Sequence, residues 1–246
     1  MSQQKTKNII VDAGNTRIKI AVFEGDSLID FDTINNSDWD TILAKLAIHN
    51  NANSLLCSVL NKNKTQELVA ALEPKIIFSP ETKTPVDFSG YDSAETLGAD
   101  RKANSIAAWS GLSSKYGLVI DVGTCIKFDL VNSDGKYLGG SISPGLNMRL
   151  KALSDNTGRL PYVKSKIKEA NLVGTSTESA ILSGCLNGWK AEINGFLAQY
   201  KTAFDDLTIF LTGGDMYLLD SLRKNGIFAD ENLTLKGLNL ILAYNA

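Results

Sequence analysis

A short motif that occurs twice in these 246 residues places the strongest constraint on the fold. Residues 8–19, "NIIVDAGNTRIK", and residues 117–127, "GLVIDVGTCIK", each lead an apolar strand into Asp-x-Gly, a threonine and a final Ile-Lys pair. With a gap of one residue after the glycine, the matched positions are Asp12 with Asp121, Gly14 with Gly123, Thr16 with Thr124, Ile18 with Ile126 and Lys19 with Lys127. Because a repeated unit of sequence is typical of a repeated unit of structure, we predict two equivalent domains.

The elements predicted around the two motifs follow a similar order. Three closely spaced strand patterns in each half, at 8–34 and 117–145, predict an antiparallel meander. In the first half we then expect a helix capped by Ser37, strands at 54–60 and 75–79 with a helix at 64–74 between them, a long loop at 80–96 and a helix at 97–110. In the second half we expect helices around 147–155 and over 176–201, a strand at 207–213, a helix near 216–226 and a terminal helix at 235–246. This order predicts an α/β fold with domains at residues 1–113 and 114–246.

Composition and charge exclude several classes of partner. The net charge is −2, so the chain lacks the basic surface that binding to a phosphate backbone requires, and we expect no nucleic acid partner. No apolar run is long enough to span a bilayer and the first strand is too short for a secretion signal, so we expect no membrane partner. Cys57, Cys125 and Cys185 are far apart and form no C-x-x-C pair, which favours a cytoplasmic protein over a disulfide framework or a zinc site. His49 is the only histidine, so Ser-His chemistry would have to use it.

The repeated turn has the chemistry of an anion site. A tight Gly-containing turn between two strands directs several backbone N–H groups to one point, and glycine lets a phosphate approach the backbone closely. Each copy adds a hydroxyl, from Thr16 or Thr124, and a strand-end carboxylate, Asp12 or Asp121, suited to a hydrated metal ion. A single copy also fits ordinary hairpin chemistry, in which Asp and Gly only serve the turn. Two copies in the same context favour the interpretation that the two turns hold a polyphosphate from both sides.

Five motifs, in order along the chain, resemble those of the type III pantothenate kinase family within the actin, sugar-kinase and Hsp70 superfamily. They are "DAGNTRIK" and "DVGTCIKFD" for two phosphate turns, "YDSAETLGADR" for the acceptor pocket, "GTSTESAILSG" for a helix start and "FLTGGD" for the adenosine side. The resemblance covers nearly the whole chain. It implies two ribonuclease-H-like domains of the actin-like ATPase type, each a mixed sheet with an antiparallel three-strand meander and flanking helices, with an ATP cleft between them.

The resemblance also implies a role for each matching residue. Asp100 is implied to be the catalytic base that accepts the proton of the acceptor hydroxyl. A first-turn aspartate is, however, also favoured by the helix dipole alone. The implied substrate-binding residues are Tyr91, Gly98, Ala99, Asp100, Arg101 and Thr177. Arg101 would pair either with the substrate carboxylate or with the transferring phosphoryl group, and Thr177 has helix capping as an alternative role.

The implied ATP-binding residues come from three of the motifs. They are Asp12, Ala13, Gly14, Asn15, Thr16, Arg17, Ile18, Lys19, Thr124, Gly213 and Gly214. For the two glycines at 213 and 214, a simple strand-to-helix turn is an equally good interpretation. Magnesium is implied with ATP, through Asp12, and a monovalent cation, potassium or ammonium, is implied at Asp121.

One position departs from the family pattern close to that cation. Lys127 stands where the family usually has a small residue, most often threonine, and Cys125 stands where alanine is common. A Lys127 ammonium that points inward would take the place of the cation, whereas one that points outward would change nothing. We favour the outward orientation.

The activity implied by the resemblance is transfer of a phosphoryl group from ATP to the primary hydroxyl of pantothenate, the first step of coenzyme A biosynthesis. The family implies a homodimer whose acceptor pocket is completed at the subunit interface. Two alternatives stay open: a kinase of another small alcohol on the same scaffold, and a non-catalytic regulatory relative of the transcription accessory factor type. The presence of Asp12, Asp100 and Asp121 together weighs against loss of catalysis.

Overall fold

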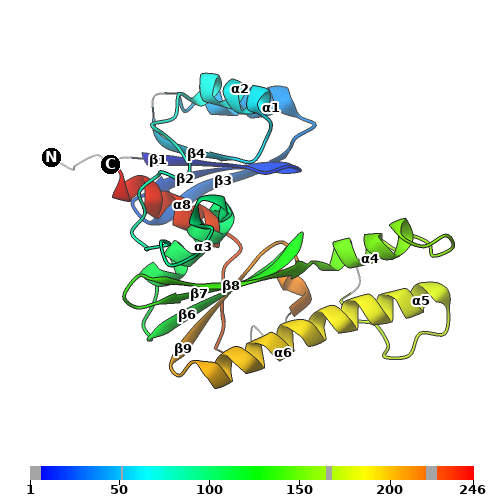
Figure 1. Cartoon of the computed structure of the whole chain (residues 1–246). Coiled ribbons are helices and arrows are strands. Elements are labelled where there is room, and N and C mark those ends of the chain that lie inside the picture. Colours follow the sequence, from blue (N-terminus) through cyan, green and yellow to red (C-terminus); the bar gives the residue numbers. More distant parts are fainter. Residues whose placement is uncertain (1–6, 51, 165–167, 220–225) are drawn as a thin grey trace. The chain divides into compact units, whose positions relative to one another are not determined.

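The computed structural model describes residues 7–50, 52–164, 168–219 and 226–246 (Figure 1). The chain divides into two compact units, one formed by Met1–Ser110 with Asn232–Ala246 and the other by Gly111–Glu231. This division differs from the predicted domains at 1–113 and 114–246, because the last fifteen residues pack with the first unit. Within the described residues, no helix combines the length and the apolar character that a bilayer crossing needs.

The first unit is built on a mixed sheet with the strand order β3-β2-β1-β4-β5 in its described part. The strands are β1 (Lys7–Ala13), β2 (Arg17–Glu24), β3 (Ser27–Asn35), β4 (Asn53–Ser58) and β5 (Ile76–Ile77). The first three pair antiparallel, which confirms the predicted meander, and β4 and β5 continue the sheet parallel to β1. Most of the β1 residues are buried, as expected for a central strand that is covered on both faces.

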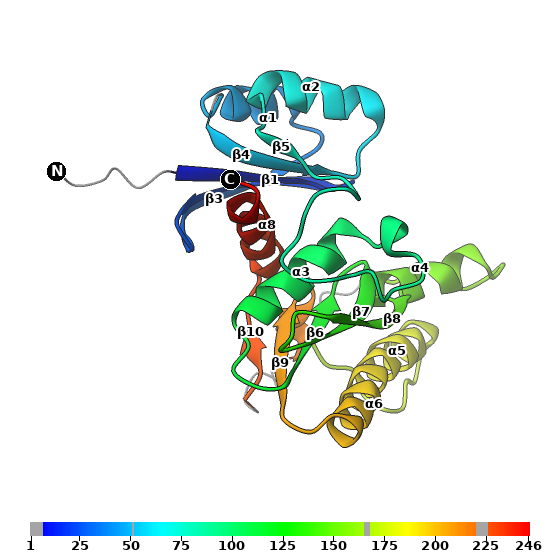
Figure 2. The same ribbon diagram turned by 60° about the vertical axis from the view of Figure 1, so that its left-hand side comes forward.

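Helices cover the two faces of this sheet. On one face lie α1 (Trp39–Ala47) and α2 (Lys62–Leu72), and on the other lie α3 (Ala99–Ser110) and α8 (Leu233–Tyr244) (Figures 1 and 2). The core beneath α1 and α2 takes alternate residues of β1, namely Ile9, Val11 and Ala13. Because strand side chains alternate between faces, Asn8, Ile10 and Asp12 point toward α3 and α8. The predicted cap Ser37 is replaced by Asp38, directly before α1.

Close contact between α3 and α8 completes the core of the first unit. A side chain at Gly237 of α8 would lie 1.9 Å from the carbonyl oxygen of Ala103 in α3, so only glycine allows the helices to approach this closely. Buried polar groups fix α8 on the sheet. The Asn8 amide donates to Asn239 Oδ1 at 2.8 Å, and the Asn239 amide donates to the Gly25 carbonyl at 2.9 Å. The terminal helix, which we expected in the second domain, therefore belongs to the core of the first.

The second unit repeats the sheet of the first, with the strand order β10-β9-β6-β7-β8 in the residues described. The strands are β6 (Tyr116–Val122), β7 (Cys125–Asn132), β8 (Tyr137–Pro144), β9 (Leu207–Thr212) and β10 (Phe228–Ala229). As in the first unit, an antiparallel meander is extended by two strands parallel to its first strand. The two sheets thus share one topology, which confirms the predicted α/β fold with two equivalent mixed sheets.

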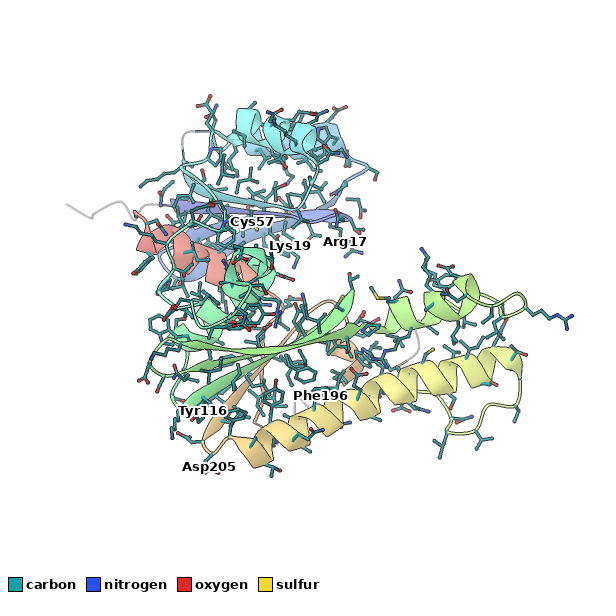
Figure 3. The ribbon with its side chains drawn as sticks, in the orientation of Figure 1. Arg17, Lys19, Cys57, Tyr116, Phe196 and Asp205 are labelled. Carbon is teal, nitrogen blue, oxygen red and sulfur yellow. The ribbon has the colours of Figure 1, made fainter. Side chains whose placement is uncertain are left out.

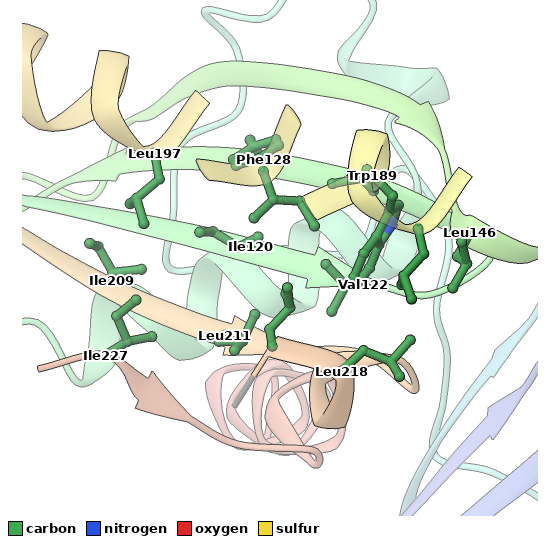
Figure 4. Packing of buried hydrophobic residues seen from close by; sticks show 14 of the residues in the cluster. Ile120, Val122, Phe128, Leu146, Trp189, Leu197, Ile209, Leu211, Leu218 and Ile227 are labelled. Atoms are coloured by element: carbon green, nitrogen blue, oxygen red, sulfur yellow. The ribbon is translucent and has the colours of Figure 1, made fainter. Parts of the chain in front are cut away.

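One face of the second sheet carries the hydrophobic core of that unit (Figure 4). Trp189 and Phe128 are its largest fully buried side chains. The helices are α4 (Leu146–Asp155), α5 (Thr177–Leu182) and α6 (Gly188–Ala203), with a short 3₁₀ turn at Met216–Leu219. A π-helical turn at Ser183–Asn187 joins α5 to α6, where we had predicted one continuous helix over 176–201. Of the helix predicted near 216–226, only this 3₁₀ turn and residue 226 lie within the described residues.

The contact between α3 and α8 generates a test of the fold. Gly237→Ala should destabilise the protein by roughly 3 kcal/mol, because the methyl group meets backbone atoms that cannot rotate away. The matched control is Gly195→Ala in α6, where a side chain would meet no atom within 4 Å. This control should leave stability unchanged or raise it by about 0.5–1 kcal/mol through helix propensity. Urea unfolding followed by circular dichroism measures both, and equal stability of the two variants would contradict the close packing.

Candidate active site

The two repeated turns occupy equivalent positions in their sheets. Asp12 lies opposite Lys19 across β1 and β2, and Asp121 lies opposite Lys127 across β6 and β7. The Gly14 N–H donates to the Arg17 carbonyl at 3.1 Å in the first turn. The second turn is one residue shorter, and there the Gly123 N–H donates to the Cys125 carbonyl at 3.0 Å. The strand register therefore reproduces the one-residue gap in the sequence alignment.

The first turn is exposed and is fixed from behind by an asparagine. Asn15, Thr16 and Arg17 are exposed at the tip of the turn, and Figure 3 shows Arg17 at that end of β2. The Asn36 side chain donates to the carbonyls of Gly14 and Asn15, both at 2.9 Å. Asn36 was missed in the sequence, where it is only the residue that follows the third strand. Its two hydrogen bonds hold the carbonyls and so fix the conformation of the turn.

Two carboxylates of the first unit influence the pKa of one buried thiol. Cys57 lies on β4 directly beside Asp12 of β1, and Figure 3 shows it near Lys19. Burial raises the pKa of the Cys57 thiol, and the carboxylates of Asp12 and Asp100 raise this pKa further. Both carboxylates must be close to the thiol to act on it. The strand-end aspartate of the first motif and the aspartate of G-x-D-R therefore both lie within electrostatic range of this thiol.

The start of α3 presents Asp100. Its Oδ1 accepts the Arg101 backbone N–H at 2.9 Å, and the position in the first turn places its negative charge at the positive end of the helix dipole. A side chain at Gly98 would come within 2.6 Å of the same oxygen. Glycine at 98 therefore leaves room for the carboxylate, which gives the G-x-D-R pattern a steric reason in this chain.

Other predicted acceptor residues lie around the same helix start. The Arg101 guanidinium lies over the Tyr91 ring, 5.9 Å from its centre, and the Arg101 residue is only 5% exposed. This contact joins the long loop at 80–96 to α3. Ala99 is the first residue of α3. The structure thus brings Tyr91, Gly98, Ala99, Asp100 and Arg101 together within the first unit.

A cavity of about 450 Å³ lies beside these residues, and sequence reasoning did not find it. The loop at 80–89 lines it together with Ala94, Glu95 and Lys102. The Lys102 ammonium is 5.7 Å from the centre of the Phe88 ring. Burial lowers the pKa of Lys102, although Glu81 and Glu95 act in the opposite direction. The available signals were the length of the loop and the position of Lys102 directly after the G-x-D-R motif.

In the second unit, the lysine of the repeated motif forms an ion pair. The Lys127 ammonium lies 2.7 Å from Asp121 Oδ2, and the side chains are 15% and 11% exposed, respectively. The outward orientation that we favoured for Lys127 is therefore wrong. The ammonium is held inward because cross-strand pairing places it opposite the carboxylate.

The other oxygen of Asp121 lies against the glycine turn after β9. Gly213 has φ +99°, and a side chain there would come within 2.5 Å of Asp121 Oδ1. Two residues further on, the Asp215 N–H donates to the Val122 carbonyl at 2.9 Å. Burial raises the pKa of Asp215, and the neighbouring Asp121 carboxylate adds to this shift. Gly213 is thus required by its backbone conformation and by the approach of Asp121.

The remaining predicted residues lie in the second unit. Thr124 is exposed in the second turn, and its carbonyl accepts the Gly145 N–H at 3.0 Å. Gly214 follows Gly213, and a side chain there would meet no atom within 4 Å. Thr177 is the first residue of α5, but Ser176 caps this helix in a capping box with Ser179. Capping therefore does not require the Thr177 hydroxyl.

The donor groups fit magnesium and monovalent cations differently. Magnesium bound with a nucleotide needs only one or two carboxylates, because phosphate oxygens and water complete its shell. Asp12, with Asp100 nearby, supplies such groups, and no cluster of three or more His, Cys, Asp or Glu is found among the residues described. Asp121 is different because its Oδ2 already binds an ammonium. The described residues therefore fit magnesium at Asp12 and do not fit an added monovalent cation at Asp121.

In the comparison with known proteins, the family model and the similar relatives carry the same description. A family model described as type III pantothenate kinase matches residues 8–199. A type III pantothenate kinase from Bacteroides fragilis is 40% identical over 240 residues, covering 97% of this chain and 98% of the relative. One from Christiangramia forsetii is 39% identical over 249 residues, with the same coverage of both chains.

Solved structures are similar in fold. A Campylobacter jejuni protein, named as a Baf family transcriptional activator, has a TM-score of 0.62 and 23% identity, and the match covers 96% of this chain and 98% of that one. An inorganic polyphosphate/ATP-glucomannokinase from Arthrobacter has a TM-score of 0.53 and 13% identity, covering 98% and 100%. At these identities the likeness concerns the fold alone, and with the two sheets it confirms the predicted two-domain actin-like α/β fold.

The environment of Asp215 predicts a pH-dependent change in stability. Because its pKa is raised on folding, the ionised carboxylate costs free energy near pH 7, and this cost disappears below the ordinary aspartate pKa, where both states are protonated. Asp215→Asn should therefore raise Tm by roughly 2 °C at pH 7, with the gain shrinking as the pH falls toward about 4. Calorimetry across this range measures it, with exposed Asp205→Asn as the matched control. A lower Tm for Asp215→Asn at pH 7 would contradict the assignment.

Proposed function

The chain belongs to the type III pantothenate kinase family, and from this premise we propose how its own residues carry the transfer of a phosphoryl group from ATP to pantothenate. Members of the family are phosphotransferases that act in coenzyme A biosynthesis, and this chain is one of them. The observation that carries the proposed site is the position of Asp12 directly beside Cys57 on the neighbouring strand, because this thiol also feels the charge of Asp100. It brings the proposed phosphate turn and the proposed base into one neighbourhood.

The first proposal concerns ATP. The exposed turn Gly14–Arg17, with Asp12, Ala13, Ile18 and Lys19 on its flanking strands, binds the phosphates through backbone N–H groups and the lysine charge. The hydrogen bonds from Asn36 support this role, because they hold the turn rigid before a ligand arrives. Thr124 of the equivalent turn adds a hydroxyl contact, and Gly213 and Gly214 let the adenosine part approach the backbone. Magnesium bound through Asp12 would neutralise charge on the phosphates.

The second proposal concerns the reacting hydroxyl. Asp100 accepts the proton of the pantothenate hydroxyl while that oxygen attacks the terminal phosphorus of ATP, and ADP leaves as the bond from this phosphorus to the bridging oxygen breaks. Its place at the helix start supports this role, because the hydrogen bond from the Arg101 N–H fixes the direction of the carboxylate. The space at Gly98 keeps the carboxylate accessible. Positioning of the oxygen and charge stabilisation supply most of the rate enhancement.

The third proposal concerns the acceptor pocket. Tyr91, Gly98, Ala99 and Arg101 bind pantothenate, with Arg101 paired to the substrate carboxylate. The contact between Arg101 and Tyr91 supports this, because it pre-orients the guanidinium before the substrate binds. The substrate-contacting role of Thr177 is supported by the finding that Ser176 already caps α5.

The assembly and location are also proposed. We expect a homodimer in which a second copy completes the acceptor pocket, as the family resemblance implies. Light scattering of the purified protein should give twice the chain mass of 26.6 kDa. A monomeric mass with full activity would overturn the dimer. The cytoplasmic location stays a prediction, supported by three cysteines that are free in the structure.

The role of Asp100 predicts a sharp kinetic result. Asp100→Asn should lower kcat for phosphopantothenate formation by roughly 10²-fold or more, because the amide cannot accept the hydroxyl proton. The substitution keeps an oxygen for the Arg101 N–H, so ATP affinity measured by calorimetry should not change. Asp92→Asn, which changes an exposed aspartate in the loop before α3, is the matched control and should keep full turnover.

The same assay tests the acceptor. Purified protein with ATP is offered pantothenate or a panel of other small alcohols, and the phosphorylated product is measured. Product from pantothenate alone supports the proposal. Preferred phosphorylation of another alcohol would overturn the substrate assignment, and near-normal turnover by Asp100→Asn would remove that residue from the mechanism.

A further inference from the structure

The second repeated turn holds a positive charge of its own. The Lys127 ammonium is 2.7 Å from Asp121 Oδ2, which is the length of a charge-assisted hydrogen bond. The pair is fixed by the backbone, because Asp121 and Lys127 lie directly opposite each other on antiparallel strands. Neighbouring Ile126 and Phe128 are buried in the core on the other face of the sheet. A one-residue slip that separated the pair would expose this core.

The surroundings of Asp121 require such a charge. The Asp121 residue is only 8% exposed, and a mostly buried carboxylate is costly unless a positive group compensates it. A second carboxylate, Asp215, lies near enough to feel the charge of Asp121. The backbone of Gly213 lies close to Oδ1, since a Cβ atom there would come within 2.5 Å of this oxygen. Two neighbouring carboxylates with limited solvent access are an environment that binds a cation, and here the chain supplies the cation itself.

We propose that the ammonium of Lys127 permanently occupies the position of the monovalent cation at Asp121, so that neither ATP binding nor phosphoryl transfer depends on potassium or ammonium ions. The inference rests on the proposed function of this turn in ATP binding. A lysine ammonium and a potassium ion carry the same charge and are similar in size. The tethered group differs in that it stays beside Asp121 at every salt concentration.

The decisive measurement uses the unmodified protein. Phosphopantothenate formation is measured in potassium chloride, ammonium chloride and tetramethylammonium chloride at one ionic strength. Tetramethylammonium is the reference cation, because it is much larger than potassium or ammonium. The affinity for a non-hydrolysable ATP analogue is measured by calorimetry in the same three salts. Both quantities should be unchanged among the salts. Turnover or analogue binding that requires potassium would overturn the inference.

Variants then assign the effect to the lysine. Lys127→Thr opens the site next to Asp121 and should make analogue binding dependent on potassium, by roughly 10-fold or more. Potassium should also raise the Tm of this variant, because an ion that binds the folded state stabilises it. Lys127→Gln, which keeps the length of the side chain, is the second variant if Lys127→Thr does not fold. Lys136→Thr removes an exposed lysine of the same unit and is the matched control, which should behave as the unmodified protein.

The outcomes separate this inference from the function on which it rests. Absence of phosphopantothenate in every salt would overturn the proposed function, while analogue binding in the three salts still decides the role of Lys127. A Lys127→Thr protein that binds the analogue equally well in all three salts would overturn the inference, even if the activity and binding of the unmodified protein do not depend on potassium. A new potassium dependence in Lys127→Thr and Lys127→Gln, and not in Lys136→Thr, supports it.

Discussion

Cross-strand pairing at the ends of two central strands is the constraint on which the candidate site depends. It places Lys19 opposite Asp12 and Lys127 opposite Asp121. The register is fixed by the cores, because the neighbours of these residues along each strand are buried on the other face of the sheet. Packing of apolar side chains on one face thus determines the direction of the charged side chains on the other.

The terminal helix shows how the chain completes the first unit. The face of β1 that carries Asp12 also carries Asn8, and α8 is fixed there by the hydrogen bond between Asn8 and Asn239. The helix is apolar on most sides, and it buries its leucines against α3, β1 and β4. The close approach at Gly237 seats α3 against α8. Because Asp100 stands at the start of α3, the position of the proposed base depends on a segment more than 130 residues away in the sequence.

The sequence predicted the parts of this structure that local pattern determines. Repeated motifs gave both meanders and, through the one-residue gap, the register of both turns. Three expectations failed where tertiary packing decides. The apolar pattern of the terminal helix does not determine which of the two sheets the helix covers. The position of Lys127 in its strand does not determine whether that face of the sheet is covered. The π-helical turn at Ser183–Asn187 interrupts a helical pattern that continues unbroken in the sequence. The cavity beside Lys102 could not be predicted from the sequence, because hydrophobic periodicity does not determine the path of a long loop.

Duplication gives a physical reason why a lysine came to stand where a cation is expected. Each unit combines a strand-end aspartate, a second carboxylate nearby and a lysine on the neighbouring strand: Asp12, Asp100 and Lys19 in one, and Asp121, Asp215 and Lys127 in the other. In the first unit the turn is longer by one residue, and its tip is exposed. In the second unit the glycine turn at 213 lies close to the aspartate, and the lysine forms an ion pair with that carboxylate. The same strand register therefore occurs in two environments: Asp12 is partly exposed, whereas Asp121 is buried and paired with Lys127.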